Sequence, residues 1–267
     1  MNKKIIVLSF LLWSAACNND TEKNTVDNTP PILNYSVVKA LPHDTTSFTE
    51  GFLFHNGQLY ESTGHTDNYP SSRSLFGSVD LSSGKIQTKA EIDKNKYFGE
   101  GIVFLNGKVY QLTLDNKIGF VYDAKTFKKI GEFTFPSEHG WGMTTDGRYL
   151  IMSDGSSNIY YLDPNNYKLA KIVGVTDNNG PLSNINELEM IGGYIYANHW
   201  QTNDILKIDP SSGKVVGKLD LSSLANEAQN KYPGSAEMNG IAYDSSLNKI
   251  YVTGKMWPNI YEITFSH

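Results

Sequence analysis

The stretch EGIVFLNGKVYQL, residues 100–112, consists of two apolar runs joined by Asn106-Gly107. An Asn-Gly pair between apolar runs is the strongest short-range signal for a β-hairpin, because both residues tolerate the positive φ angles of a type I′ turn. The same layout begins near residues 51, 101, 142, 188 and 240, with a longer turn in the last repeat. The chain therefore repeats one hairpin design five times.

A third apolar run follows each hairpin, and a polar turn then opens a fourth run. Four-stranded units at this spacing are typical of β-propeller blades. We therefore predict an all-β, five-bladed β-propeller over residues 33–267. A pair of β-sandwiches, the competing fold, would not explain five hairpins of one design.

The strand-like segment 35–40 precedes the first unit, whereas the fifth unit ends after its third strand. We therefore expect this N-terminal strand to complete the last blade and to close the ring, which removes the exposed sheet edges. The best helical candidate is a single stretch at residues 221–229, in an inserted loop.

The composition agrees with a β-rich fold and argues against nucleic acid as a partner. Of the 267 residues, 39% are hydrophobic and 12% aromatic, and there are 23 glycines. The net charge is −5, and Arg73 and Arg148 are the only arginines. Phosphate-binding surfaces are usually basic and rich in arginine.

The N-terminus has the layout of a secretory signal. A positive start is followed by the apolar run 5–13 and by Cys17, the only cysteine of the chain. The segment resembles a bacterial lipobox, although Ser14 stands where leucine is usual. We expect a lipoprotein signal peptide over residues 1–17 with lipidation at Cys17, rather than simple secretion or a buried thiol. The protein would be exported and lipid-anchored to a bacterial membrane, on its periplasmic or cell-surface side, with residues 18–32 as a flexible tether.

Residues that could take part in catalysis or binding recur at the start of every repeat. Glu50, Glu100, Trp141, Glu187 and Asn239 open the units and should line one mouth of the channel. A glutamate buried there would have a raised pKa, as a general acid or base requires. The alternative is structural, because inner-strand polar groups of propellers often only bond to neighbouring blades.

Common cofactor and metal motifs are missing from the sequence. The six histidines lack the spacing of a zinc site, and no nucleophile elbow, P-loop or dinucleotide motif occurs. We therefore expect no metal in catalysis and no required cofactor. A calcium ion on the propeller axis, held by oxygen ligands, would be structural rather than catalytic.

Ten short phrases identify a family resemblance. In chain order they are Phe48-Thr-Glu-Gly-Phe, Tyr60-Glu-Ser-Thr-Gly, Phe98-Gly-Glu-Gly-Ile, Tyr110-Gln-Leu-Thr, Gly140-Trp-Gly-Met-Thr-Thr-Asp-Gly, Ser153-Asp-Gly-Ser, Asn186-Glu-Leu-Glu, Ala197-Asn-His-Trp-Gln-Thr, Asn239-Gly-Ile-Ala-Tyr and Thr253-Gly-Lys-Met-Trp-Pro. Together, over residues 35–265, they closely resemble the plant and bacterial type of glutaminyl-peptide cyclotransferase (glutaminyl cyclase).

The resemblance implies a five-bladed propeller that converts an N-terminal glutamine into pyroglutamate and releases ammonia without zinc. The partner would be a peptide or protein with an N-terminal glutamine. The membrane would be contacted only through the lipid anchor, and we expect a monomer.

The resemblance also implies roles for individual residues. Glu61 would be the catalytic acid and base, with Asn186 and Lys255 as further catalytic residues. The residues expected to bind substrate are Glu50, Trp141, Trp200 and Phe48. The chain departs from the family pattern at Glu50, where Gln is frequent, and at Leu114, where Trp is frequent, which bears on substrate preference.

Two other functions stay open from the sequence. One is a non-catalytic surface propeller that binds peptide or glycan. The other is a lactonase- or hydrolase-type propeller with a metal in the channel. An ammonia assay on glutaminyl peptides, with and without EDTA, separates the three.

Overall fold

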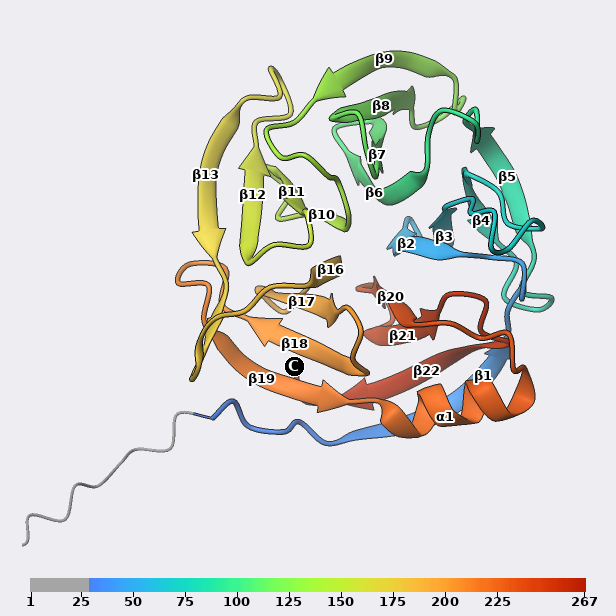
Figure 1. Ribbon diagram of the computed structural model, residues 1–267, viewed down its shortest axis with the longest axis vertical. Helices are drawn as coiled ribbons and strands as arrows, with labels where there is room; N and C mark the ends of the chain where they lie inside the picture. The colour runs from blue at the N-terminus through green and yellow to red at the C-terminus, as the bar shows by residue number, and fades with distance from the viewer. Residues whose placement is uncertain (1–28) are drawn as a thin grey trace, which may run out of the picture.

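Five four-stranded antiparallel sheets surround a central axis in the computed structural model, which describes residues 29–267 (Figure 1). From the axis outward, the first blade comprises β2 (Thr49–His55), β3 (Gln58–Thr63), β4 (Leu75–Val79) and β5 (Ile86–Glu91). The second comprises β6 (Gly99–Leu105), β7 (Lys108–Thr113), β8 (Ile118–Asp123) and β9 (Lys129–Thr134). The third comprises β10 (Met143–Thr145), β11 (Leu150–Ser153), β12 (Asn158–Leu162) and β13 (Leu169–Gly174). The fourth comprises β16 (Ile185–Ile191), β17 (Tyr194–His199), β18 (Asp204–Ile208) and β19 (Val215–Asp220), and the short pair β14 (Thr176–Asp177) and β15 (Gly180–Pro181) precedes it. The predicted five-bladed propeller is confirmed.

The N-terminal strand closes the ring, as the sequence predicted. The fifth blade has the order β20 (Met238–Asp244), β21 (Lys249–Gly254), β22 (Asn259–Phe265) and β1 (Tyr35–Pro42). Strand β1 pairs antiparallel with β22, and Figure 1 shows these two strands side by side in this blade. The last blade therefore contains strands from both ends of the sequence.

The ordered domain begins slightly before the expected boundary at residue 33. The amide of Leu33 donates to the Lys218 carbonyl at 2.7 Å, and the amide of Lys218 donates to the Pro31 carbonyl at 2.9 Å. Residues 31–33 thus lie against β19, so this part of the expected tether belongs to the folded domain. The expected signal peptide, residues 1–17 with Cys17, and the expected tether up to residue 28 lie outside the described residues.

The hairpin turns follow from their sequences. Asn56 and Gly57 have φ angles of 50° and 74°, and Asn106 and Gly107 have φ angles of 53° and 73°. Both angles are positive, as a type I′ turn requires. These turns set the pairing of the first two strands in their blades.

The hydrophobic core consists of five separate clusters, one between each pair of neighbouring blades. The cluster between the first and fifth blades, for example, joins Phe52 and Leu59 to Ala242, Tyr251 and Ile260. Because both faces of a blade are covered by neighbours, an inner strand such as β6 is buried along its whole length. The packing therefore fixes the inner strands around the axis.

The single helix among residues 29–267, α1 (Ser222–Lys231), lies on the outside of the ring (Figure 1). It buries Leu224 and Ala228 in the cluster between the fourth and fifth blades. This confirms the helical prediction, with both bounds moved toward the C-terminus. Within the described part of the chain, no helix is long and apolar enough to span a membrane.

Candidate active site

A cavity of about 320 Å³ lies where the inner strands begin. Its lining comprises Phe48, Glu50, Thr66, Phe98, Glu100, Leu114, Trp141, Asn186, Trp200 and Lys255. The structure thus brings together six of the seven residues expected to bind substrate or to act in catalysis, leaving out only Glu61. We treat this cavity as the candidate site.

Equivalent positions of three inner strands supply three of its polar residues, and the same position of a fourth strand supplies Asn239, which is hydrogen-bonded to Glu50. Glu50, Glu100, Asn186 and Asn239 are each the second residue of their strand, in β2, β6, β16 and β20. Blades related by rotation about the axis place equivalent positions at the same height. The repeat itself therefore makes these side chains converge.

Glu50 and Lys255 form a buried ion pair at the centre of the site. Oε1 of Glu50 lies 2.7 Å from Nζ of Lys255, and Oε2 accepts a hydrogen bond from Nδ2 of Asn239 at 3.0 Å. The ammonium also lies 4.5 Å from the centre of the Phe48 ring. The Glu50 carboxylate, itself held by the Asn239 amide, and the Phe48 ring hold the lysine side chain in one place.

Burial sets the protonation of this pair. It raises the pKa of Glu50 to about 7, although the charge of Lys255 opposes the rise. Burial lowers the pKa of Lys255, but the charges of Glu50 and Glu100 outweigh it, so that the pKa lies above its ordinary value. Lys255 is therefore an ammonium group across the neutral range.

Glu100 differs from Glu50 in having a free oxygen. It is 3% exposed, and its Oε2 atom has no hydrogen-bond partner among residues 29–267. Burial and the negative charge of Glu50 raise the pKa of the Glu100 carboxyl well above its ordinary range. An unpartnered buried carboxyl in a cavity has the protonation properties of a general acid or base.

Aromatic rings form the walls. The rings of Trp141 and Trp200 meet edge to face with centroids 5.3 Å apart, and those of Phe48 and Phe98 are 6.0 Å apart. Two groups of this wall lack hydrogen-bond partners in the described chain, Nε1 of Trp141 and Oδ1 of Asn186. The cavity thus offers one free donor and one free acceptor beside the charged groups.

A glycine positions Trp141. A Cβ atom at Gly155, whose φ angle is +79°, would lie 2.6 Å from the Trp141 ring. Only glycine allows both this backbone conformation and the close approach of the ring.

Glu61, which the resemblance implied as the catalytic acid and base, does not line this cavity. Its carboxylate is fully buried, lies 3.1 Å from Nε2 of His43 through both oxygens, and accepts a 2.7 Å hydrogen bond from Thr49 Oγ1. The sequence phrase around Glu61 does not reveal that its carboxylate is engaged by His43 and Thr49.

Glu187 illustrates the structural alternative for inner-strand glutamates. Its oxygens accept hydrogen bonds from the amides of Phe52 at 3.2 Å and Ile241 at 2.9 Å, so it ties β16 to β2 and β20. Of the three glutamates considered from the sequence, only Glu50 and Glu100 line the cavity.

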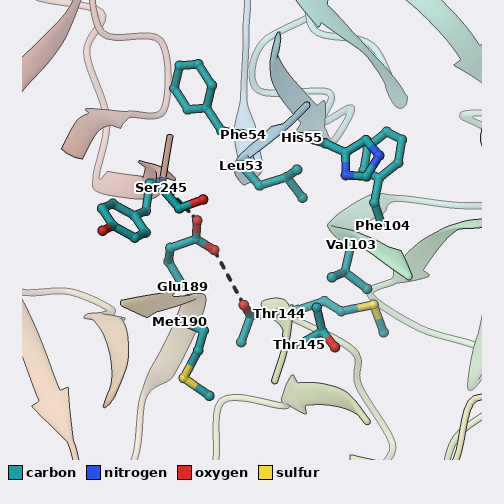
Figure 2. A pocket seen from close by; sticks show the side chains of 12 residues that line it. Leu53, Phe54, His55, Val103, Phe104, Thr144, Thr145, Glu189, Met190 and Ser245 are labelled. Carbon is teal, nitrogen blue, oxygen red and sulfur yellow. Dashed lines mark hydrogen bonds between the residues drawn. The ribbon is translucent and has the colours of Figure 1, made fainter. Parts of the chain in front are cut away.

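A second cavity, of about 220 Å³, lies at the opposite end of the inner strands (Figure 2). Its carboxylate, Glu189, accepts hydrogen bonds from the Tyr243 amide at 2.9 Å and from the Thr144 hydroxyl at 3.4 Å. Both oxygens are therefore engaged, unlike those of Glu100. Nowhere in residues 29–267 do three or more His, Cys, Asp or Glu side chains form a group that could hold a metal ion.

Sequence reasoning gave Glu100 no individual role. The signal was present, because Phe98-Gly-Glu-Gly repeats the pattern Phe48-Thr-Glu-Gly one blade later. Phe98 and Thr66, which also line the cavity, were not predicted either.

Comparisons with known proteins agree with this architecture. A family model described as glutamine cyclotransferase matches residues 6–265. Over 242 residues the chain is 36% identical to an Arabidopsis thaliana protein named glutaminyl-peptide cyclotransferase, covering 90% of this chain and 74% of the relative. The crystal structure of Myxococcus xanthus glutaminyl cyclase is similar with a TM-score of 0.78 and 30% identity, over 89% of this chain and 98% of the other. The chain belongs to the glutamine cyclotransferase family.

Proposed function

We propose that this protein converts the N-terminal glutamine of peptides or proteins into pyroglutamate and releases ammonia, with Glu100 as the acid and base. The observation that carries the proposal is the buried Glu100 carboxyl, whose Oε2 has no partner in the described chain and which shares an aromatic cavity with the Glu50–Lys255 ion pair. The family membership supports the same reaction.

The first requirement is a folded substrate. The α-amine of the glutamine must approach its own side-chain carbonyl carbon, whereas a free glutamine side chain is mostly extended. A cavity of about 320 Å³ walled by Trp141 and Trp200 suits the compact conformer and excludes the extended one. Holding reacting groups in such a geometry removes a large part of the barrier.

The second requirement is proton transfer. The α-amine attacks the carbonyl carbon, a C–N bond forms, and the Glu100 carboxylate accepts the amine proton. The same carboxyl then donates this proton to the side-chain nitrogen as the original C–N bond breaks and ammonia leaves. A free α-amine has a pKa of roughly 7.7–8.0, so a carboxyl with a raised pKa is well matched to both transfers.

The third requirement is stabilisation of the oxyanion that forms on the carbonyl oxygen. Lys255 Nζ and the unpartnered Nε1–H of Trp141 are the available donors. Asn186 Oδ1 has no partner in the described chain, and we assign it to accept a hydrogen bond from a substrate N–H group. Preorganised donors of this kind are usually the largest single contribution to such catalysis.

The test is an ammonia assay, with mass spectrometry of the product, on a peptide that starts with glutamine. The control peptide carries the same glutamine at its second position. Glu100→Gln should lower kcat by about 10²–10⁴-fold, the usual worth of a general acid or base. Glu132→Gln, at an exposed position of β9, should have no effect. EDTA should leave the wild-type rate unchanged, because Glu100 supplies the proton transfer.

An active Glu100→Gln protein would reject the assignment of Glu100, and a wild-type protein without ammonia release would reject the reaction. In the second case, binding of the intact peptide would favour the non-catalytic propeller. A hydrolytic activity that EDTA abolishes would favour the metal-containing hydrolase.

We also propose, from the sequence, that the enzyme is exported and lipid-anchored through Cys17. Labelling cells with a palmitate analogue should modify the wild-type protein and not Cys17→Ser. Equal labelling of both would contradict the anchor.

A further inference from the structure

The Glu61 cluster consists of Glu61, His43 and the backbone carbonyl of Trp257. The proposed reaction does not use it, and it connects three parts of the chain. Glu61 lies on β3 of the first blade, and His43 follows the closing strand β1. Nδ1 of His43 lies 2.8 Å from the carbonyl oxygen of Trp257, which follows β21 of the fifth blade. His43 and Glu61 side chains are both 0% exposed.

The hydrogen-bond chemistry fixes the protons of this cluster. A carbonyl oxygen can only accept, so Nδ1 of His43 carries a hydrogen and donates it to Trp257. On the other side of the ring, both oxygens of Glu61 lie 3.1 Å from Nε2, so one further proton is shared between ring and carboxyl. Burial lowers the pKa of His43, but the charge and hydrogen bond of Glu61 outweigh it and raise that pKa. The pair is therefore neutral overall and fully engaged.

The carbonyl that His43 holds belongs to the turn that carries Lys255. The amide of Trp257 donates to the Gly254 carbonyl at 3.1 Å, and Met256 has a positive φ angle of 60°. The Met256 amide donates to the Ser47 carbonyl at 2.7 Å, and the His43 amide donates to the Pro258 carbonyl at 3.0 Å. Residues 43–47 thus hold the turn at Met256, Trp257 and Pro258, the three residues that directly follow Lys255.

We propose that His43 and Glu61 are positioning residues, which hold the turn 254–258 so that Lys255 keeps its place in the cavity. The inference rests on the proposed function, in which Lys255 donates to the oxyanion. Neither residue lines the cavity, so neither touches the substrate. Glu61 orients the imidazole, the imidazole holds the Trp257 carbonyl, and the turn places the ammonium beside Glu50.

Two other roles are distinguishable from positioning. If Glu61 transferred protons to the substrate, its amide variant would be as inactive as Glu100→Gln. If the pair only stabilised the fold, its loss would lower the unfolding temperature without changing kcat of the folded protein.

The experiment uses the full chain, Glu100→Gln and four further variants, two of which are also combined with Lys255→Met. Glu61→Gln keeps a hydrogen-bonding group beside a neutral His43, and we expect kcat within about threefold of wild type. His43→Asn in the E61Q background keeps a side-chain N–H near the position of Nδ1, whereas His43→Ala in the same background removes it. Neither double variant leaves a buried charge unpaired. Lys255→Met removes the ammonium and keeps the side-chain stem.

The expected result is a difference between the double variants. H43A/E61Q should lose about tenfold to a hundredfold in kcat, with a smaller change in KM, because a displacement of catalytic groups by about 1 Å has effects of that size. H43N/E61Q should retain most of the rate. In the K255M background, the same two changes should differ by less than about twofold, because their effect acts through Lys255. Circular dichroism at the assay temperature checks that each protein is folded.

A second readout needs no turnover. The Lys255 side-chain NMR resonance, assigned by its absence in Lys255→Met, should stay in place in H43N/E61Q and shift in H43A/E61Q. If H43A/E61Q does not fold, H43Q/E61Q replaces it, since its amide nitrogen lies one carbon farther from the backbone.

Positioning is overturned by equal kcat values for the two double variants, by losses that multiply in the K255M background, or by an unmoved Lys255 resonance. It is also overturned if Glu61→Gln is as inactive as Glu100→Gln. A wild-type protein that releases no ammonia would instead reject the proposed function, and the resonance would then decide the positioning role alone.

Discussion

Oε1 of Glu50 lies 2.7 Å from Nζ of Lys255 although both side chains are less than a tenth exposed. Withdrawing two charges from water is costly, and their attraction compensates only with good geometry and further hydrogen bonds. Asn239 supplies one such bond to Glu50 at 3.0 Å. With Glu100 nearby, the cavity therefore contains two carboxyl groups and one ammonium, whose protonation states depend on one another.

Replacing Glu50 with glutamine should shift the pH dependence of the reaction. The negative charge of Glu50 contributes to the raised pKa of Glu100, and the charge of Lys255 opposes it. In Glu50→Gln the pKa of Glu100 falls, so the carboxylate form persists to lower pH. The acidic limb of kcat/KM should move to lower pH, whereas that of Glu132→Gln should stay in place. An unchanged limb would show that Glu50 does not influence the base.

Replacing Gly155 with alanine should disturb the aromatic wall. The new Cβ atom would lie 2.6 Å from the Trp141 ring, which must move. We expect kcat/KM for a glutaminyl peptide to fall by about tenfold, because positioning errors of this kind are costly. Gly147→Ala is the matched control, since its φ angle is also positive, at +85°, and a Cβ atom there would meet nothing within 4 Å. Equal kinetic losses in both variants would point to backbone strain rather than to the wall.

The stability of the fold should fall as the pH rises from about 5 to about 8. Burial raises the pKa of Glu189 from 4.5 to about 8, so the folded protein keeps a proton that the unfolded chain releases in this interval. The contribution of this proton to the free energy of unfolding is complete below pH 4.5. It decreases by on the order of 1 kcal/mol per pH unit as the pH rises, and it is lost once the pH passes the folded pKa. Urea unfolding at several pH values measures it.

Glu189→Gln should lower the slope of this pH dependence, and the raised pKa values of Glu50, Glu100 and Glu187 account for the slope that stays. A glutamine can still accept from the Tyr243 amide and meet the Thr144 hydroxyl, the contact drawn in Figure 2. A variant with the same slope as wild type would assign the effect to other groups.

A chain that begins at His43 should not form a stable ring. It lacks β1, so β22 loses its antiparallel partner from Tyr35 to Pro42. We expect a loss of about 5 kcal/mol or more in the free energy of unfolding, comparable to the whole stability of many domains. A chain that begins at Pro31 is the control and should unfold like the full chain. Cooperative unfolding of the shorter chain at the same temperature would show that closure is not needed.

The sequence alone determined the repeat, the number of blades and the strand that closes them. These features depend on short-range physics: Asn56-Gly57 and Asn106-Gly107 favour positive φ angles, and apolar residues in the flanking runs face neighbouring blades. The sequence also predicted six of the residues that line the cavity, because positions that are equivalent in the repeat are equivalent around the axis.

Only the tertiary structure decided which carboxyl group is available for chemistry. Glu50, Glu100 and Glu187 stand at similar positions near the start of their repeats, and the family resemblance implied Glu61 as the catalytic residue. The difference lies in partners distant along the chain: backbone amides of Phe52 and Ile241 engage Glu187, and His43 engages Glu61. Glu100 has no such partner for its Oε2 within residues 29–267, and packing between blades, not local sequence, leaves that oxygen free.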